Sequence, residues 1–152
     1  MPRTVREIEK IWANVEGLKK LSDRVVGIGP FGVGLDGLLT WVPWAGDAYT
    51  VGAGAWLLMQ GVRAKASPAT LIRMAGYLAA DTATAAVPFA GAVVDTLFVA
   101  HAMAAKALQK DIESTHWVEA SEREARAAGD HDRHLATVRN DPKLRRLVYL
   151  HD

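Results

Sequence analysis

The 152-residue chain contains no cysteine, and this absence removes several kinds of site together. Without thiols the chain cannot form a disulfide, a cysteine-ligated zinc site or a cysteine nucleophile. The net charge is also small, at +1, whereas binding to the phosphates of a nucleic acid requires a strongly basic face. We therefore expect no thiol chemistry and no nucleic-acid partner.

Long uninterrupted apolar runs are also lacking. Each apolar run between charged residues is only about fifteen residues long, whereas a simple membrane span needs roughly twenty. The first ten residues carry charges where a signal peptide would be apolar. We therefore expect an N-terminus that stays in the cytoplasm and apolar segments that do not cross a bilayer as simple straight spans.

One stretch of the sequence occurs twice in the chain. The first copy reads DGLLTWVPWAG over 36–46, and the second reads DTATAAVPFAG over 81–91. Proline disfavours helix at the residue before it but is well tolerated in the first turn of a new helix. Each copy therefore predicts a corner between two helices. The structural corner residues are Pro43, Gly46, Asp47, Pro88 and Gly91.

Helical periodicity predicts an all-α fold in three parts. Residues 1–26 form an amphipathic helix, which begins with the capping-box spacing of Thr4 and Glu7. Residues 27–115 form two pseudo-repeated helical hairpins with Pro-Gly corners, with copies at about 34–65 and 68–112. The apolar stripe of the first helix packs either on the protein core or on the membrane interface.

The remaining part, 116–152, reads as a polar helical tail. We expect the last apolar helix to continue as far as Trp117. We also expect the helix after the first hairpin to begin with Ser67 as its N-cap and Pro68 as its first residue.

Positive charge flanks both apolar stretches. The charges lie before the first stretch, between the two and after the second, at Lys19, Lys20, Arg24, Arg63, Lys65, Arg73, Lys106 and Lys110. Under the positive-inside tendency these flanks share the cytoplasmic side, so two re-entrant hairpins would enter the bilayer from one face. A broken helix at membrane depth must be buried by protein, so the tips would pack on each other or on a partner. The open alternative is a soluble bundle of Ala- and Gly-rich helices.

The residues around the two corners carry a family resemblance. The segments 34–47, 71–81 and 87–95 together resemble the bacterial domain-of-unknown-function family numbered 4112, over about Leu21 to Asp111. The resemblance implies a small, helical, membrane-associated protein and implies no catalytic residues. The first copy has the Gly46-Asp47 pair, whereas the second has Ala92 where aspartate is usual, with Asp95 three residues later. A site that needs two equal corners is therefore in doubt.

Acidic residues among apolar helices are the first candidates for a site. Ionisable groups in a membrane are costly, and they are usually paired or functional. One interpretation is a polar or ion cluster near the tips that binds a proton or cation. The other is structural, with Asp47 accepting backbone N–H groups at a helix start and His101 buried and hydrogen-bonded rather than acting as a proton relay. The cluster comprises Asp36, Asp47, Asp81, Asp95 and His101.

No pattern of catalytic or metal-binding residues is evident. The run from Asp130 to His134 contains possible ligands, but its loose spacing favours a solvated loop or a helix start. The serines lack the glycine context of a nucleophile elbow, and no histidine pairs with a carboxylate at a recognisable spacing. We therefore expect no enzyme activity, no cofactor and no metal.

Together these features predict a membrane-associated accessory or scaffold protein of the bacterial inner membrane, with cytoplasmic termini. It would be a small subunit of a larger membrane complex or a homo-oligomer. Its partners would be the lipid bilayer and either another protein or a second copy. Two alternatives stay open, namely proton or cation handling through the intramembrane aspartates and a soluble helical binding module.

Overall fold

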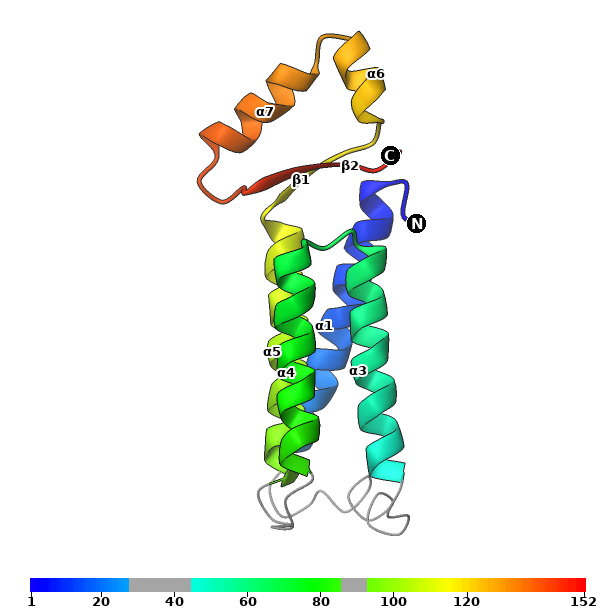
Figure 1. Ribbon diagram of the computed structural model, residues 1–152, viewed down its shortest axis with the longest axis vertical. Coiled ribbons are helices and arrows are strands. Elements are labelled where there is room, and N and C mark those ends of the chain that lie inside the picture. Colours follow the sequence, from blue (N-terminus) through cyan, green and yellow to red (C-terminus); the bar gives the residue numbers. More distant parts are fainter. Residues whose placement is uncertain (28–44, 86–92) are drawn as a thin grey trace.

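The computed structural model describes the backbone of residues 1–27, 45–85 and 93–152, and the side chains of 1–20, 51–80 and 99–152. Four long helices form a bundle, and a small α/β unit covers one end of it (Figure 1). The bundle helices are α1 (Val5–Gly27), α3 (Ala45–Arg63), α4 (Pro68–Ala85) and α5 (Val93–Glu113). The C-terminal unit contains β1 (Thr115–Val118), α6 (Glu122–Ala127), α7 (His131–Asn140) and β2 (Arg146–Tyr149).

The predicted caps of α1 and α4 are confirmed. Glu7 N donates to Thr4 Oγ1 at 3.3 Å, and Thr4 N donates to Glu7 Oε2 at 3.2 Å. These reciprocal bonds satisfy donors that the first helical turn leaves free. At the start of α4, Thr70 N donates to Ser67 Oγ at 3.3 Å, and Pro68 is the first helical residue.

A tight turn joins α3 to α4. Lys65 has a φ of 47°, in the left-handed region. Its N–H donates to Val62 O at 3.0 Å, and Ala66 N donates to Gly61 O at 3.0 Å. This bonding pattern is a Schellman motif, which usually places glycine where Lys65 stands. The short turn makes α3 and α4 antiparallel neighbours (Figure 1).

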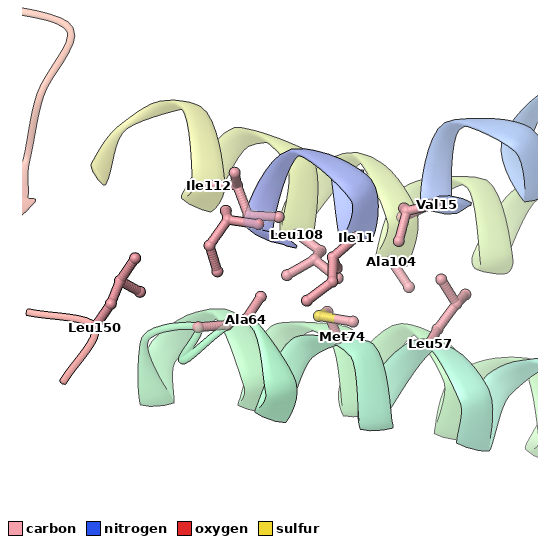
Figure 2. Packing of buried hydrophobic residues seen from close by; sticks show 12 residues of the cluster. Ile11, Val15, Leu57, Ala64, Met74, Ala104, Leu108, Ile112 and Leu150 are labelled. Atoms are coloured by element: carbon pink, nitrogen blue, oxygen red, sulfur yellow. The ribbon is translucent and has the colours of Figure 1, made fainter. Parts of the chain in front are cut away.

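The core lies between the four bundle helices. α5 contacts α1, α3 and α4. Figure 2 shows Ile11 and Val15 of α1 facing Leu57 and Met74, which belong to α3 and α4. The apolar stripe of α1 therefore packs on the protein core, which is one of the two interpretations that the sequence left open.

The described helix ends that flank the two corner segments lie at one end of the bundle. α1 and α4 end there, and α3 and α5 begin there (Figure 1), so we call it the corner end. The opposite end, next to the C-terminal unit, is the junction end. Residues 28–44 and 86–92 lie outside the described part of the chain, including Asp36, Pro43, Pro88 and Gly91. The corners and the repeat of two hairpins therefore stay predictions.

The all-α prediction holds only in its coarse form. The chain is mostly helical, but β1 and β2 pair in parallel, with Thr115 opposite Arg146 and Val118 opposite Tyr149. A helical tail is therefore wrong as a full description of 116–152. Leu150, which follows β2, is buried in the bundle core, so this segment is also packed rather than simply solvated (Figure 2).

The prediction that the last apolar helix continues to Trp117 is wrong, because α5 ends at Glu113. Ser114 Oγ and Thr115 Oγ1 donate to Asp111 O at 3.2 and 2.7 Å, and Trp117 Nε1 donates to Ile112 O at 3.2 Å. These side chains satisfy carbonyls that a helix end leaves free. The run Thr-His-Trp-Val that follows contains β-branched and aromatic residues, which suit a strand.

Candidate functional site

The structure places the backbone of three predicted aspartates towards the corner end. Asp47 and Asp95 are each the third residue of their helices, α3 and α5, while Asp81 lies in the last turns of α4. The first turn of a helix favours negative charge, so the positions of Asp47 and Asp95 agree with the structural interpretation. Gly46 lies within the first turn of α3 rather than before it.

His101 lies on α5, where α3 approaches closely. The side chain is buried, with 7% of its surface exposed. A Cβ added to Gly54 of α3 would lie 3.6 Å from His101 Nε2 and 3.4 Å from Leu78 Cδ2 of α4. Gly54 therefore allows α3 to pack closely against α4 and α5, as the small residues of this stretch predict.

The outward surface of α3 and α4 is apolar, and we call it the α3–α4 face. Its large exposed side chains are Val51, Met59, Val62 and Ile72, with between 51% and 73% of their surface exposed. The other exposed positions over 51–62 and 69–80 are glycine or alanine, except Arg73. No charged residue occurs over 48–62, and Arg73 is the only one over 66–80. Large apolar side chains exposed on neighbouring helices are candidates for an interaction site. Val99 and Met103 of α5 are exposed as well, at 51% and 43%.

The exposed surface of α1 has the opposite character. Arg6, Glu9, Lys10 and Lys20 are exposed along this helix, which packs mainly on α5. The bundle therefore has a charged helix and an apolar pair of helices. The sequence showed the apolar runs of α3 and α4, but it did not show that large residues within them face outward.

The cationic flanks do not lie at one end of the bundle, contrary to the shared side that the sequence predicted. Lys19 and Lys20 belong to the C-terminal half of α1 and lie towards the corner end. Arg63 and Lys110 lie in the last turns of α3 and α5, at the junction end. The difference arises because α1 is an antiparallel member of the bundle rather than a separate helix.

A polar cluster at the junction end was missed by sequence reasoning. Asp111 Oδ1 accepts from Ser67 Oγ at 2.9 Å and Thr70 Oγ1 at 3.1 Å. Asp111 Oδ2 accepts from Ser67 N at 3.0 Å and Arg146 Nη1 at 3.1 Å. Arg146 Nη2 also donates to Lys65 O. All these bonds connect structural elements, so the cluster fixes the C-terminal unit onto the bundle.

A second group of side chains holds α7 on the two strands. His116 Nε2 and His134 Nδ1 are 3.1 Å apart, and His131 Nδ1 lies 2.9 Å from the Tyr149 hydroxyl. Burial lowers the pKa of His116, and the nearby charge of His134 lowers it further. The run from Asp130 to His134 is a helix start, since α7 begins at His131.

The described ranges contain neither of two features that would assign a function directly. Within them, no three histidine or carboxylate side chains converge as a metal-binding group would. None of the helices in these ranges combines the length and the hydropathy needed to cross a bilayer.

Comparison with known proteins gives one match. The model of a family described as a domain of unknown function (DUF4112) matches residues 11–112. The match includes both copies of the repeated stretch. It begins at Ile11, inside α1, whereas the resemblance seen in the sequence began only at about Leu21. No curated protein and no solved structure matches the chain. Because the family model covers more than half of its length, the chain belongs to the DUF4112 family.

Proposed function

We propose that this protein is a membrane-associated accessory or scaffold protein, which contacts the bilayer surface through its α3–α4 face. The observation that carries the proposal is the exposure of Val51, Met59, Val62 and Ile72 on a surface with almost no charge. Membrane binding of this interfacial kind grows with the apolar area that leaves water.

The four side chains supply a useful driving force. Complete burial of such a side chain is worth roughly 1.5–3 kcal/mol. Each of the four is at least half exposed, so burial of the remaining surface contributes roughly 1 kcal/mol or more per side chain. The exposed glycines and alanines between them add little area but allow a flat contact.

The sequence of the corner segments supports contact near the corner end. Residues 28–44 contain a single charged residue, Asp36, and residues 86–92 contain none. The described helix ends that flank both segments lie at the corner end (Figure 1). An orientation with the α3–α4 face towards lipid also keeps the charged surface of α1 in water, which avoids the cost of burying ionised groups.

The accessory role follows from the small residues of the same face. Gly52, Gly76 and Ala80 are exposed on α3 and α4. Small residues allow the backbone of another helix to approach closely in a membrane setting. A membrane partner or a second copy would therefore find both lipid-compatible surface and room for helix contact here.

Flotation with lipid vesicles tests the proposal. The purified full chain should float with vesicles of phosphatidylcholine, and Met59→Glu and Ile72→Glu should each reduce the bound fraction strongly, because a carboxylate is costly at a lipid-facing position. Both positions are exposed, so the variants should keep the wild-type melting temperature.

A matched control is Ala13→Glu, which places the same charge on an exposed position of α1. This variant should float as the wild type does. A wild-type chain that stays with the soluble fraction would contradict membrane association and leave the soluble binding module as the better description. Unchanged flotation of Ile72→Glu would contradict the role of the α3–α4 face.

A further inference from the structure

Helix α7 packs on β1 and β2 through a mostly polar inner face. Every residue of α7 lies in the described part of the chain, and none of them is buried. Only His131, His134 and Val138 are partly covered, and the other positions are exposed. These three residues share one side of the helix, since they are three and four positions apart. The contact of α7 with the strands therefore depends on two imidazoles and one valine.

The surface that α7 covers is one face of the two-stranded sheet. Side chains alternate between the two faces of a strand, and Trp117 and Arg146 face the bundle, where they contact its core and α5. The opposite face contains His116 and Tyr149, and both contact side chains of α7. Tyr149 is buried, with the rings of two α7 histidines against it. Helix α7 therefore acts as a cover for this face.

The two polar contacts under α7 respond differently to protons. His116 Nε2 and His134 Nδ1 are 3.1 Å apart, so one ring donates and the other accepts. One added proton keeps this bond, with a charged donor and a neutral acceptor, whereas a second proton leaves two donors and two like charges face to face. His131 Nδ1, 2.9 Å from the Tyr149 hydroxyl, can still donate to that oxygen when its ring is protonated. Acid therefore breaks only the pair of His116 and His134.

No carboxylate offsets the second charge. In the described part of the chain, neither ring forms an ion pair. The other titratable or charged residues of α7 and β2 are His131, Asp132, Arg133, Arg139, Arg146 and Tyr149. Asp132 lies two positions from His134, so it faces another side of α7. On α6, Glu122 pairs with Arg126 at 2.6 Å, and Glu124 caps its own helix.

We propose that α7 is an acid-released cover of the β1–β2 sheet. At neutral pH the bond between His116 and His134 holds α7 on the strands. When this pair takes up its second proton, α7 leaves the sheet and uncovers Tyr149, while the four-helix bundle stays folded. The bundle is unaffected because its core and the ion pair of Asp111 with Arg146 lie on the other face of the sheet.

The release occurs below the ordinary range of histidine. Burial first, and then the charge of His134, lower the pKa of His116 below 6.5. Because the open form binds one proton more than the closed form, its population should rise by up to about tenfold for each pH unit in this range.

Pulsed EPR distance measurements on the full chain test the proposal. The chain has no cysteine, so Ala136→Cys on α7 and Ala69→Cys on α4, both at exposed positions, direct nitroxide labels to these two sites alone. One narrow distance distribution is expected at about pH 7.5, and a second, broader one should appear at about pH 5, where histidine clusters protonate. Far-UV circular dichroism should keep the helical signal of the bundle at both pH values.

Two histidine variants locate the switch in the doubly labelled chain. His116→Gln should keep α7 closed at both pH values, because a carboxamide can accept from the protonated ring of His134 and donate to the neutral one. The matched control, His131→Gln, removes the other imidazole of α7. It should raise the open fraction at both pH values and keep the acid response.

Three results would overturn the proposal. The first is a wild-type distance distribution that is the same at both pH values. The second is a wild-type acid response in His116→Gln, or the loss of this response in His131→Gln, because the switch would then lie elsewhere. The third is the loss of the bundle's helical signal at about pH 5, which would mean global unfolding rather than local release.

Discussion

The carboxylate of Asp111 and the guanidinium of Arg146 lie 3.1 Å apart, and this ion pair joins α5 to β2. Asp111 is also the acceptor for Ser67 and Thr70 at the start of α4. One side chain therefore connects two bundle helices to the C-terminal unit. Only 9% of the Asp111 side chain and 21% of the Arg146 side chain are exposed, so water competes weakly with these bonds.

Replacement of Asp111 should loosen the attachment of the C-terminal unit. Asp111→Ala leaves three donor groups and one guanidinium without their acceptor, so we expect a loss of about 3 kcal/mol in the free energy of unfolding. Urea unfolding measures the loss, and hydrogen exchange should show faster exchange in β1 and β2. Arg145→Met, a change at an exposed neighbour of Arg146, should have little effect. Similar losses for Arg145→Met and Asp111→Ala would contradict the specific role of the ion pair.

Lys65 combines an unfavourable backbone conformation with useful side-chain bonds. Its φ is 47°, and its Nζ donates to Tyr149 O at 3.1 Å and Asp152 O at 2.9 Å. Both Lys65→Ala and Lys65→Gly lose the ammonium, but only glycine relieves the left-handed conformation. We therefore expect Lys65→Gly to be more stable than Lys65→Ala by about 1 kcal/mol. Thermal unfolding of the two variants checks this, and equal stability would contradict it.

Two glycines should respond differently to the same substitution. A Cβ on Gly76 meets nothing within 4 Å, so Gly76→Ala should stabilise α4 by roughly 0.5–1 kcal/mol. A Cβ on Gly61 would lie 2.8 Å from Leu71 Cδ2, so the required shift of this side chain should cancel much of the same gain. Urea unfolding of both variants gives the difference. A larger gain from Gly61→Ala than from Gly76→Ala would show that α3 and α4 are less closely packed there.

Acidification should weaken the C-terminal unit in the range where histidine titrates. Burial first, and then His134, lower the pKa of His116 below its ordinary value of 6.5. The unfolded chain therefore binds more protons than the folded chain in this range, and stability falls as the pH drops below 6.5. Above 6.5 this residue causes no pH dependence. Trp117, its neighbour on β1, provides a fluorescence signal for urea titrations on both sides of this value.

The pH dependence should decrease in His116→Phe. An exposed histidine, His151, provides the control variant His151→Asn, which should keep the wild-type dependence in this range. If His116→Phe and the wild type lost stability equally on acidification, another group would be responsible.

The features that could be predicted from the sequence are those that depend on residues a few positions apart along the chain. The capping box of Thr4 and Glu7 requires only a spacing of three residues, and the Ser67 cap follows the same logic. The apolar stripe of α1 follows from helical periodicity. The apolar runs that follow the two prolines predicted helices, and α3 and α5 occupy these runs, whereas the proline corners themselves stay predictions.

Only the tertiary structure decided the features that join distant residues. Asp111 and Arg146 are separated by 35 positions, and no spacing rule connects them. The pairing of β1 with β2, the burial of Gln60 and the outward position of Ile72 likewise depend on how whole elements pack. An apolar helix has several faces, and its neighbours determine which of them remains exposed. The sequence by itself therefore determined the helices, their caps and the family of this protein, whereas packing decided which side chains of these helices are exposed and which are buried.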